Sequence, residues 1–281
     1  MPIPKPRHIE AQDPKYFAFR RDVLGWWVVW GGLSVAAWLI WGDIALIGSL
    51  VAFGGMVLWV MLRLYHKLQI EQFHHYWQTE ALFSLYSAVP ISKPLPPMRL
   101  WAASPDFVTL IVSAIKYNRP QVVFEVGSGI STIVTGYCLR ELGSGRVLSL
   151  EHDRRFSQVT ADNIIGHGLE DVAQVIYAPL KPTTIKTDIY LWYDLSVLEN
   201  IPPIDLLVVD GPPEGTQRMA RYPALPLLFS KLNDDAIVLV DDFMRDDEYK
   251  MVNEWLDEFK LTVIGSFANE KGAVILRKTA K

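Results

Sequence analysis

The stretch that decides the fold is Val122-Val123-Phe124-Glu125-Val126-Gly127-Ser128-Gly129-Ile130-Ser131-Thr132. Its apolar run is typical of a buried parallel strand, and its two spaced glycines allow the backbone to turn and to approach a ligand closely. Ser131 and Thr132 can open the helix that follows. The stretch therefore predicts a strand, a ligand-binding loop and a helix, which together form a nucleotide-cofactor site.

Two residues indicate which cofactor the loop suits. The dinucleotide fingerprint Gly-x-Gly-x-x-Gly would place its third glycine at position 132, where this chain has Thr132. Glu125 stands two residues before the first glycine. An acid at that place would repel a pyrophosphate but could hold a cationic amino group, directly or through water. S-adenosylmethionine (SAM) carries such a group.

At this point the chain resembles the class I SAM-dependent methyltransferases, whose first motif is commonly acid-x-Gly-x-Gly followed by a small residue. The resemblance covers roughly residues 100–279, which is most of the chain but not its N-terminal part. It implies that SAM is bound by residues of the loop, namely Glu125, Gly127, Ser128, Gly129, Ser131 and Thr132.

Two further strand ends contribute to the predicted cofactor site. The apolar run 146–150 ends in Glu151, which lies about twenty residues after Gly129, where a ribose-binding carboxylate is expected. Its carboxylate can accept hydrogen bonds from both ribose hydroxyls, although it would suit NAD equally well. His152 follows it, and Ala178 follows the next strand, where it would lie beside the adenine. We therefore expect Glu151, His152 and Ala178 to complete the cofactor site.

Three acids at the ends of later strands are the candidate catalytic residues. Asp210 follows the apolar run 204–209, and Asp241 and Asp242 follow the run 236–240. Open α/β sheets bind ligands at the carboxyl ends of strands, so these carboxylates are expected to converge. They would repel one another unless a cation or a substrate base lay between them, and oxygen ligands suit Mg²⁺, Mn²⁺ or Ca²⁺. The alternative is that these residues merely cap turns and helices, where Asp is favoured.

The three acids are similar to those of the cation-dependent O-methyltransferases, such as the catechol and caffeoyl-CoA enzymes. Those enzymes take one Asp from the fourth strand end and an Asp-Asn pair from the fifth. The resemblance implies that Asp210 and Asp241 are catalytic, and that Asp210, Asp241 and Asp242 bind Mg²⁺ or another divalent cation. This chain departs from the pattern twice, because Asp242 replaces the Asn and Pro213 stands where the catechol enzyme has a lysine base.

Charged residues follow the Gly-Pro-Pro turn after Asp210. Glu214, Arg218 and Arg221 could grip an anionic substrate, because arginine forms strong charge-assisted hydrogen bonds. Charges in such a segment are more often solvated, and solvated side chains are the expectation here.

Alternating apolar runs and helical segments predict the fold. Runs near 121–126, 146–151, 172–177, 204–210 and 235–240 predict parallel strands that are separated by helical or mixed segments. Two last runs, 261–267 and 273–277, predict a hairpin. We therefore expect an α/β, doubly wound, Rossmann-like fold with a mostly parallel seven-stranded sheet and an antiparallel last strand. A hairpin of this kind belongs to the class I methyltransferase fold, and dehydrogenase Rossmann domains usually lack it.

The N-terminal part predicts a membrane anchor. Between residues 23 and 62 the only formally charged residue is Asp43, and the runs 24–41 and 44–62 are each close to the length that a hydrocarbon core requires. Gly42 and Asp43 would form the turn of a two-helix transmembrane hairpin. A signal peptide and a buried soluble hairpin are the alternatives. The expected domains are a basic segment at 1–22, the hairpin at 23–62, a helical stalk and Pro-rich linker at 63–99, and the methyltransferase domain at 100–281.

Charge and cysteine content indicate the location of the protein. Lysines and arginines flank both ends of the hairpin and none lies in its turn, so both termini and the methyltransferase domain are predicted to be cytoplasmic. Cys138 is the only cysteine, which fits a reducing compartment. The formal net charge is −4, so nothing suggests nucleic-acid binding.

The expected function is a membrane-anchored, SAM-dependent methyltransferase that acts on a hydroxyl oxygen. The acceptor would be a small molecule, a lipid or a glycan. Two alternatives stay open. One is an NAD(P)-dependent oxidoreductase, which Glu125, Thr132 and the terminal hairpin disfavour. The other is a membrane-anchored binding protein that keeps the fold without turnover.

Overall fold

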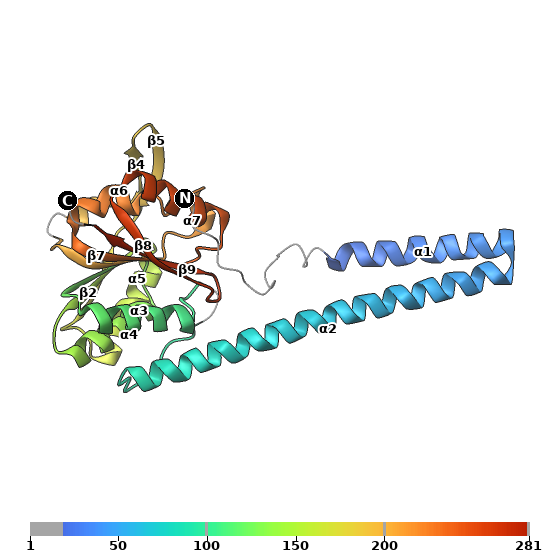
Figure 1. Cartoon of the computed structure of the whole chain (residues 1–281), viewed down its shortest axis with the longest axis horizontal. Coiled ribbons are helices and arrows are strands. Elements are labelled where there is room, and N and C mark those ends of the chain that lie inside the picture. Colours follow the sequence, from blue (N-terminus) through green and yellow to red (C-terminus); the bar gives the residue numbers. More distant parts are fainter. Residues whose placement is uncertain (1–18, 99–100, 199–200, 280–281) are drawn as a thin grey trace. The chain divides into compact units, whose positions relative to one another are not determined.

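The computed structural model describes residues 19–98, 101–198 and 201–279 (Figure 1). Most of the predicted basic segment at 1–22 therefore lies outside the described residues. The described residues form two compact units, of which one extends to Tyr76 and the other begins at Trp77.

A seven-stranded sheet forms the core of the second unit, with strands in the order β3-β2-β1-β6-β7-β9-β8. β1 is parallel to β2 and β6, β2 to β3, and β6 to β7, whereas β9 is antiparallel to both β7 and β8. The predicted sheet with its antiparallel last strand is confirmed. The strands are β1 Val122–Val126, β2 Arg146–Glu151, β3 Ala173–Tyr177, β6 Ile204–Val209, β7 Leu232–Val240, β8 Leu261–Phe267 and β9 Ala273–Lys278.

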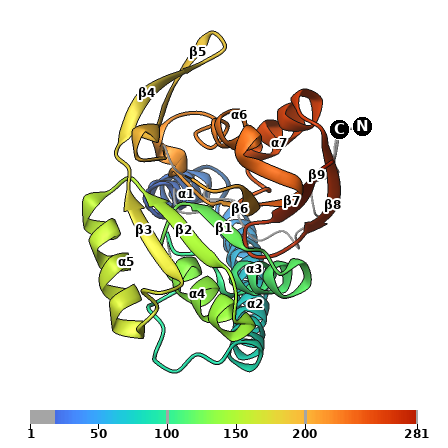
Figure 2. The same ribbon diagram turned by 90° about the vertical axis from the view of Figure 1, so that its left-hand side faces the viewer.

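Helices cover both faces of this sheet (Figure 2). One face packs against α3 (Pro105–Asn118), α4 (Ile130–Leu142) and α5 (Arg154–His167). The other packs against α6 (Ala224–Leu228) and α7 (Asp246–Glu258). Successive side chains of β1 enter the two cores, because Val123 belongs to the first cluster and Phe124 to the second. The central strands read as continuous apolar runs because both of their faces are buried.

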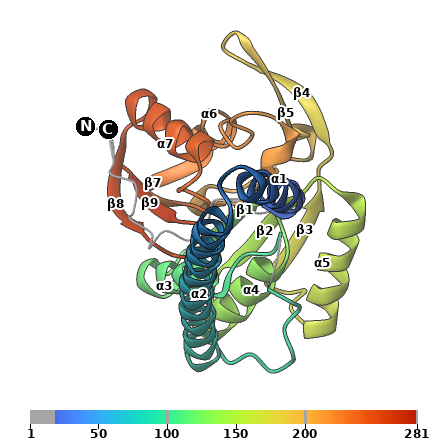
Figure 3. The same ribbon diagram turned by 90° about the vertical axis from the view of Figure 1, so that its right-hand side faces the viewer.

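A second, two-stranded sheet was not predicted from the sequence. β4 (Leu180–Ile185) and β5 (Asp188–Tyr193) pair as an antiparallel hairpin that projects from the main sheet (Figure 3). The hairpin and the short 3₁₀ helix η2 (Leu195–Leu198) take the place of a crossover helix between β3 and β6. The turn lacks the Asn-Gly signal of a tight hairpin, and Lys186 instead adopts a φ of 57°. Two further 3₁₀ turns are η3 (Glu214–Thr216) and η4 (Phe229–Lys231).

Two helices form the N-terminal part of the described chain. α1 (Phe19–Trp41) and α2 (Asp43–Ala88) meet at Gly42, where the turn was predicted and where φ is 72°. The Ser49 hydroxyl donates to the Ser34 hydroxyl at 2.6 Å and so links the two helices. Among the described residues, α2 is the one helix that is long and apolar enough to cross a membrane, and Val29–Trp41 of α1 is a shorter apolar stretch.

The last turns of α2 belong to the second unit. The Asp106 carboxylate, in the first turn of α3, accepts hydrogen bonds from the Gln78 side chain and from the Glu270 backbone N–H, both at 2.7 Å. Leu85 of α2 is fully buried in the cluster around α3 and α4. The compact unit therefore begins at Trp77, earlier than the predicted boundary at residue 100, because this end of α2 supplies part of its core.

Candidate active site

The carboxyl ends of the parallel strands form one edge at which most of the predicted site residues meet. Beyond the strands, backbone hydrogen bonds continue the pairing from Ala178 to Glu151, from Gly127 to Leu150, from Asp210 to Val126 and from Asp241 to Val209. These bonds place the residues that follow the strands side by side. Open α/β sheets bind their ligands at this edge.

The loop between β1 and α4 uses its two glycines differently. Gly127 has a φ of 105°, and a Cβ there would lie 3.2 Å from the backbone oxygen of Asp210. Glycine thus lets the loop pack closely against the end of β6. Gly129 has a φ of 145°, and a Cβ there would meet nothing within 4 Å, so this part of the loop borders open space. A ligand can therefore approach the backbone at the start of α4.

Glu125 lies beneath the loop. It is 1% exposed, and its carboxylate accepts hydrogen bonds from the hydroxyls of Thr132 at 2.6 Å, Thr135 at 3.1 Å and Ser131 at 3.3 Å. Burial raises the pKa of Glu125 to about 7, although the three hydroxyls oppose the shift. The Glu125 carboxylate thus links the loop to α4. Because it is buried, it has almost no exposed surface with which to contact the amino group of SAM directly.

Thr132 stands where a dinucleotide site would have its third glycine, and it has a structural role there together with Thr135. Thr132 is fully buried and makes the shortest of the hydrogen bonds to Glu125. Thr135 was not among the predicted site residues, although a spacing of three places it on the same face of α4 as Thr132.

Glu151 is held toward the glycine loop. The Ser128 hydroxyl donates to its Oε2 at 2.9 Å, and the backbone N–H of Asp153 donates to its Oε1 at 3.0 Å. His152 Nδ1 lies 3.0 Å from the same Oε1. The predicted neighbours Ser128, Glu151 and His152 are therefore brought together at one place beside the loop.

Ala178 lies in the core. It is fully buried, in the same hydrophobic cluster as Trp192 and Tyr193 of β5. It therefore has no exposed surface with which to contact an adenine. Trp192 and Tyr193 come from the second strand of the unpredicted hairpin, so this hairpin contributes to the core in which Ala178 lies.

The three predicted acids converge as expected. Asp210, Asp241 and Asp242 each offer a carboxylate oxygen, and these oxygens lie within 4.8 Å of one another. Asp241 and Asp242 are 0% and 1% exposed. The Asp210 side chain keeps 22% of its surface exposed, so Asp210 is the acid of this group that solvent reaches. Asp242 has a φ of 60°, a left-handed conformation that Asp and Asn adopt more readily than most residues.

Arg221 is a functional candidate that is buried, although a solvated side chain was predicted for it. It is 3% exposed, whereas the side chains of Arg218 and Glu214 are 81% and 61% exposed, as expected for solvated charges. Its Nη2 donates to Asp242 Oδ2 at 2.6 Å and lies 3.2 Å from Asp210 Oδ1. The signal that could have revealed it is the apolar segment Tyr222-Pro223-Ala224-Leu225, which directly follows the arginine.

Two further side chains complete this charged cluster. Arg245 Nη1 lies 2.9 Å from Asp242 Oδ2, so two guanidinium groups share that oxygen. Glu248 of α7 is 3% exposed, and its Oε1 lies 3.7 Å from Arg221 Nε. Neither residue was predicted from the sequence: Arg245 directly precedes α7, and Glu248 lies in the first turn of that helix.

Burial governs the protonation of the acids. It raises the pKa of Asp210 to about 6, while the attraction of Arg221 opposes the shift. It raises the pKa of Asp241 well above its usual value, and the neighbouring Asp210 and Asp242 add to the shift. Among the described residues, neither carboxylate oxygen of Asp241 has a hydrogen-bond partner. Asp210 is therefore largely ionised at neutral pH, whereas the environment of Asp241 favours the neutral form.

The donor set as it stands does not fit a divalent cation. A divalent cation among the three acids would lie beside two guanidinium groups, because Arg221 engages Asp210 Oδ1 and Asp242 Oδ2 and Arg245 engages Asp242 Oδ2 as well. Asp242 Oδ1 has no hydrogen-bond partner among the described residues. Asp241 alone keeps both oxygens without a partner among the described residues. The positive charge that pairs with Asp210 and Asp242 thus comes from guanidinium groups, and the charge of Lys271 also acts on Asp210 and Asp241.

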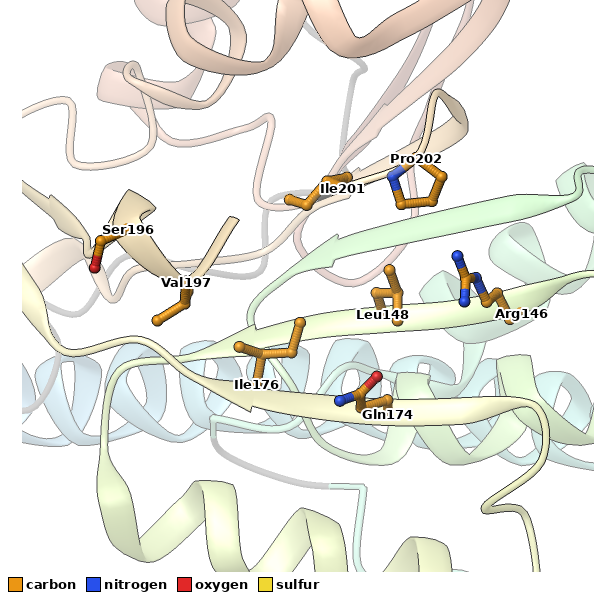
Figure 4. A pocket seen from close by; sticks show the side chains of 8 residues that line it. All are labelled: Arg146, Leu148, Gln174, Ile176, Ser196, Val197, Ile201 and Pro202. Atoms are coloured by element: carbon orange, nitrogen blue, oxygen red, sulfur yellow. The ribbon is translucent and has the colours of Figure 1, made fainter. Parts of the chain in front are cut away.

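A separate cavity of about 290 Å³ lies elsewhere on the sheet (Figure 4). It is lined by residues of β2, β3 and η2 and by the segment before β6, namely Arg146, Leu148, Gln174, Ile176, Ser196, Val197, Ile201 and Pro202. None of the predicted site residues lines it. The cavity is therefore distinct from the edge that carries the glycine loop and the acids.

Comparison with known families gives the class of this domain. Residues 124–243 match the family model described as Methyltransferase domain. This range begins in β1 and ends just after Asp242, so it includes the glycine loop, Glu151, Arg221 and the three acids. The chain therefore contains a methyltransferase domain. No curated protein matches the chain in sequence.

Solved structures show the same fold. A methyltransferase from Podospora anserina, PaMTH1, crystallised with S-adenosylhomocysteine (SAH), has a TM-score of 0.51 and 13% identity and covers 71% of this chain and 88% of its own. The O-methyltransferase TomG from Streptomyces achromogenes, involved in tomaymycin synthesis and crystallised with SAM, has a TM-score of 0.50 and 16% identity. That match covers 74% of this chain and 96% of the TomG chain. At these identities the likeness shows the fold.

Proposed function

We propose that this methyltransferase transfers a methyl group from SAM to a hydroxyl oxygen, and that α1 and α2 anchor it to a membrane with the catalytic unit on the cytoplasmic side. The proposal rests mainly on the arrangement at the carboxyl edge of the sheet. There the open glycine loop lies between Glu151 on one side and the partly exposed Asp210 on the other.

The residues beside the loop fit SAM. Ser128 and the backbone at Gly129 would receive the amino acid part, where no side chain fills the space. The Glu151 carboxylate would accept hydrogen bonds from the ribose hydroxyls, for which Ser128 and the Asp153 N–H already orient it. SAM or SAH in the crystals of two proteins of the same fold supports this cofactor.

Asp210 is the residue best placed to act on the acceptor. When bound, SAM supplies an electrophilic methyl group on its sulfonium sulfur. The acceptor oxygen must lose its proton during the transfer, and a carboxylate in the crevice can take that proton. Asp210 is partly exposed, and its pKa of about 6 makes it a stronger base than an ordinary Asp while it stays ionised at neutral pH. The departure at Pro213, which removes the lysine base, leaves this task to Asp210.

The N-terminal helices support membrane anchoring. α2 has the length and composition of a span, and a shorter apolar stretch of α1 precedes it across the turn at Gly42. Large apolar side chains of both helices are exposed, as is expected for surfaces that face lipid, and examples are Leu39, Ile40, Ile44 and Val51. A membrane location would bring the enzyme close to a lipid, a glycan or another small acceptor.

Ligand titration tests the cofactor assignment. Isothermal titration of the full-length protein in detergent is expected to show saturable binding of both SAM and SAH and no binding of NAD⁺. Binding of NAD⁺ without SAM would favour the oxidoreductase instead. SAM binding with no methyl transfer to any membrane extract would favour a binding protein that keeps the fold without turnover.

Cysteine labelling tests the two-pass topology. Cys138 is buried, so an introduced cysteine can be followed against a silent background. Ile44→Cys at the turn, where Ile44 is 85% exposed, is expected to react with a membrane-impermeant maleimide in intact cells. Ile189→Cys in β5, where Ile189 is 71% exposed, is the matched control and is expected to react only after permeabilisation. Labelling of Ile189→Cys in intact cells would contradict the cytoplasmic location.

A further inference from the structure

The guanidinium of Arg221 lies among the carboxylates at the ends of β6 and β7. Asp210, Asp241 and Asp242 come within 4.8 Å of one another, and like charges at such distances repel strongly unless a cation lies among them. Arg221 meets that need within the chain itself. Its Nη2 contacts both Asp242 and Asp210, at 2.6 Å and 3.2 Å.

Backbone contacts fix the orientation of this guanidinium. Arg221 Nη1 donates to the backbone oxygen of Asp241 at 3.3 Å, and Nε donates to that of Pro212 at 3.5 Å. These two acceptors lie directly after β7 and close after β6. The rigid planar fork of arginine can satisfy several such acceptors at once, which a lysine ammonium on a flexible stem does less well. The side chain is thus held by the same strand ends that present the acids.

We propose that Arg221 is the resident cation of this active site, and that its guanidinium takes the place that a divalent metal has in the cation-dependent O-methyltransferases. It acts as a positioning residue, because it engages Asp210 through Oδ1 and so holds the partly exposed carboxylate toward the crevice. The inference rests on the proposed function for its catalytic meaning. The mutual exclusion of the Arg221 guanidinium and a metal ion at these acids does not depend on methyl transfer.

A second guanidinium strengthens the inference. Arg245 contacts the same Asp242 oxygen from the side of α7, at 2.9 Å, and it also contacts Glu214 at 3.3 Å. Its side chain is 34% exposed, whereas that of Arg221 is 4% exposed. Arg245 therefore closes the outer side of the cluster, while Arg221 occupies its interior. A metal ion would have to displace a buried charge that already has hydrogen bonds to carboxylates and to backbone oxygens, which is costly.

Manganese binding tests the proposal without a known acceptor. The full-length wild-type protein in detergent is titrated with Mn²⁺, with and without SAH, and the free ion is followed by electron paramagnetic resonance. We expect no saturable binding in the micromolar range. Micromolar binding that Asp242→Asn abolishes would overturn the proposal, because the acids would then form a metal site with Arg221 in place.

Arg221→Gln supplies the complementary arm. Removal of the Arg221 guanidinium frees Asp210 Oδ1, leaves Arg245 as the one arginine on Asp242 Oδ2, and takes the buried positive charge away from the acids. Mn²⁺ binding is therefore expected to appear, and added guanidinium chloride is expected to compete with it. A merely structural arginine would not produce this gain. A folded Arg221→Gln protein that binds no Mn²⁺ would overturn the proposal. The matched control is Arg218→Gln, which removes an arginine from the same segment whose side chain is 81% exposed, and it is expected to behave as the wild type.

Two measurements keep the outcomes separate. If Arg221→Gln does not fold, the wild-type titration decides by itself whether the native site takes a metal. SAM affinity is measured on the same samples. If the wild-type protein did not bind SAM, the proposed function would be contradicted. If it bound Mn²⁺, only the proposed role of Arg221 would be contradicted.

Discussion

Glu125→Gln is expected to be more stable than the wild-type protein at pH 8 by roughly 3 kcal/mol, and to lose this advantage near pH 4.5. The wild-type carboxyl group has an ordinary pKa of 4.5 in the unfolded chain and a pKa of about 7 in the folded one, because it is buried. Between these values the folded state keeps a proton that the unfolded state releases. The stability of the wild type therefore falls as the pH rises from 4.5 to 7 and stays low above pH 7. Glutamine does not ionise, so the variant lacks this fall.

Thermal unfolding of the two full-length proteins in detergent measures the effect. A difference of this size corresponds to a melting temperature higher by roughly 6–12 °C for the variant at pH 8. At low pH the two proteins should melt together, because glutamine can keep hydrogen bonds with the hydroxyls of Thr132 and Thr135. Glu170→Gln, at an exposed position, is the control and should show no such pH dependence. A difference that stays constant from pH 4.5 to pH 8 would mean that Glu125 ionises as an exposed acid does.

Glu151→Ala is expected to weaken SAM binding by about a hundredfold, because a carboxylate that accepts two ribose hydroxyls contributes charge-assisted hydrogen bonds of a few kcal/mol. The alanine variant also leaves the Ser128 hydroxyl without the acceptor that it has at 2.9 Å. Glu151→Gln keeps one acceptor oxygen and should lose less affinity than the alanine variant. Isothermal titration with SAM and SAH provides the measurement.

Two controls make the result specific to the ribose. Glu170→Ala removes an exposed acid elsewhere in the same unit and should leave the affinity unchanged. Asp210→Asn changes the proposed base and should abolish methyl transfer while SAM still binds. Equal SAM affinity in Glu151→Ala and the wild type would refute the assignment of Glu151 to the ribose.

The strand ends were the part of the site that local pattern could predict. An apolar run that ends in an acid or a glycine places that residue at the carboxyl edge of a parallel sheet, and β1, β2, β6 and β7 all follow this rule. The β4–β5 hairpin could not be predicted in the same way, because its Lys186-Thr187 turn carries no hairpin signal. Ala178 is fully buried in the cluster to which this hairpin contributes Trp192 and Tyr193, and that burial could not be predicted from local pattern.

Charged residues were harder to interpret than apolar ones. Glu125 was expected to face a ligand and Arg221 to be solvated, yet the structure buries them at 1% and 3% exposure. A sequence shows that a charge is present, but its partners come from other elements. Glu125 meets hydroxyls from the helix that follows it, and Arg221 meets acids that follow β6 and β7.

The sequence by itself determined the doubly wound sheet, its antiparallel last strand, the glycine loop and the convergence of Asp210, Asp241 and Asp242. These features depend on apolar runs and on the residues that directly follow each run, and both can be read from the sequence. Only the tertiary structure decided that Glu125 fastens the loop from below and that Arg221 lies among the acids. The physical reason is that the burial and pairing of a charge depend on how separate elements pack together, and burial influences both the pKa of the charged group and the partner with which it pairs.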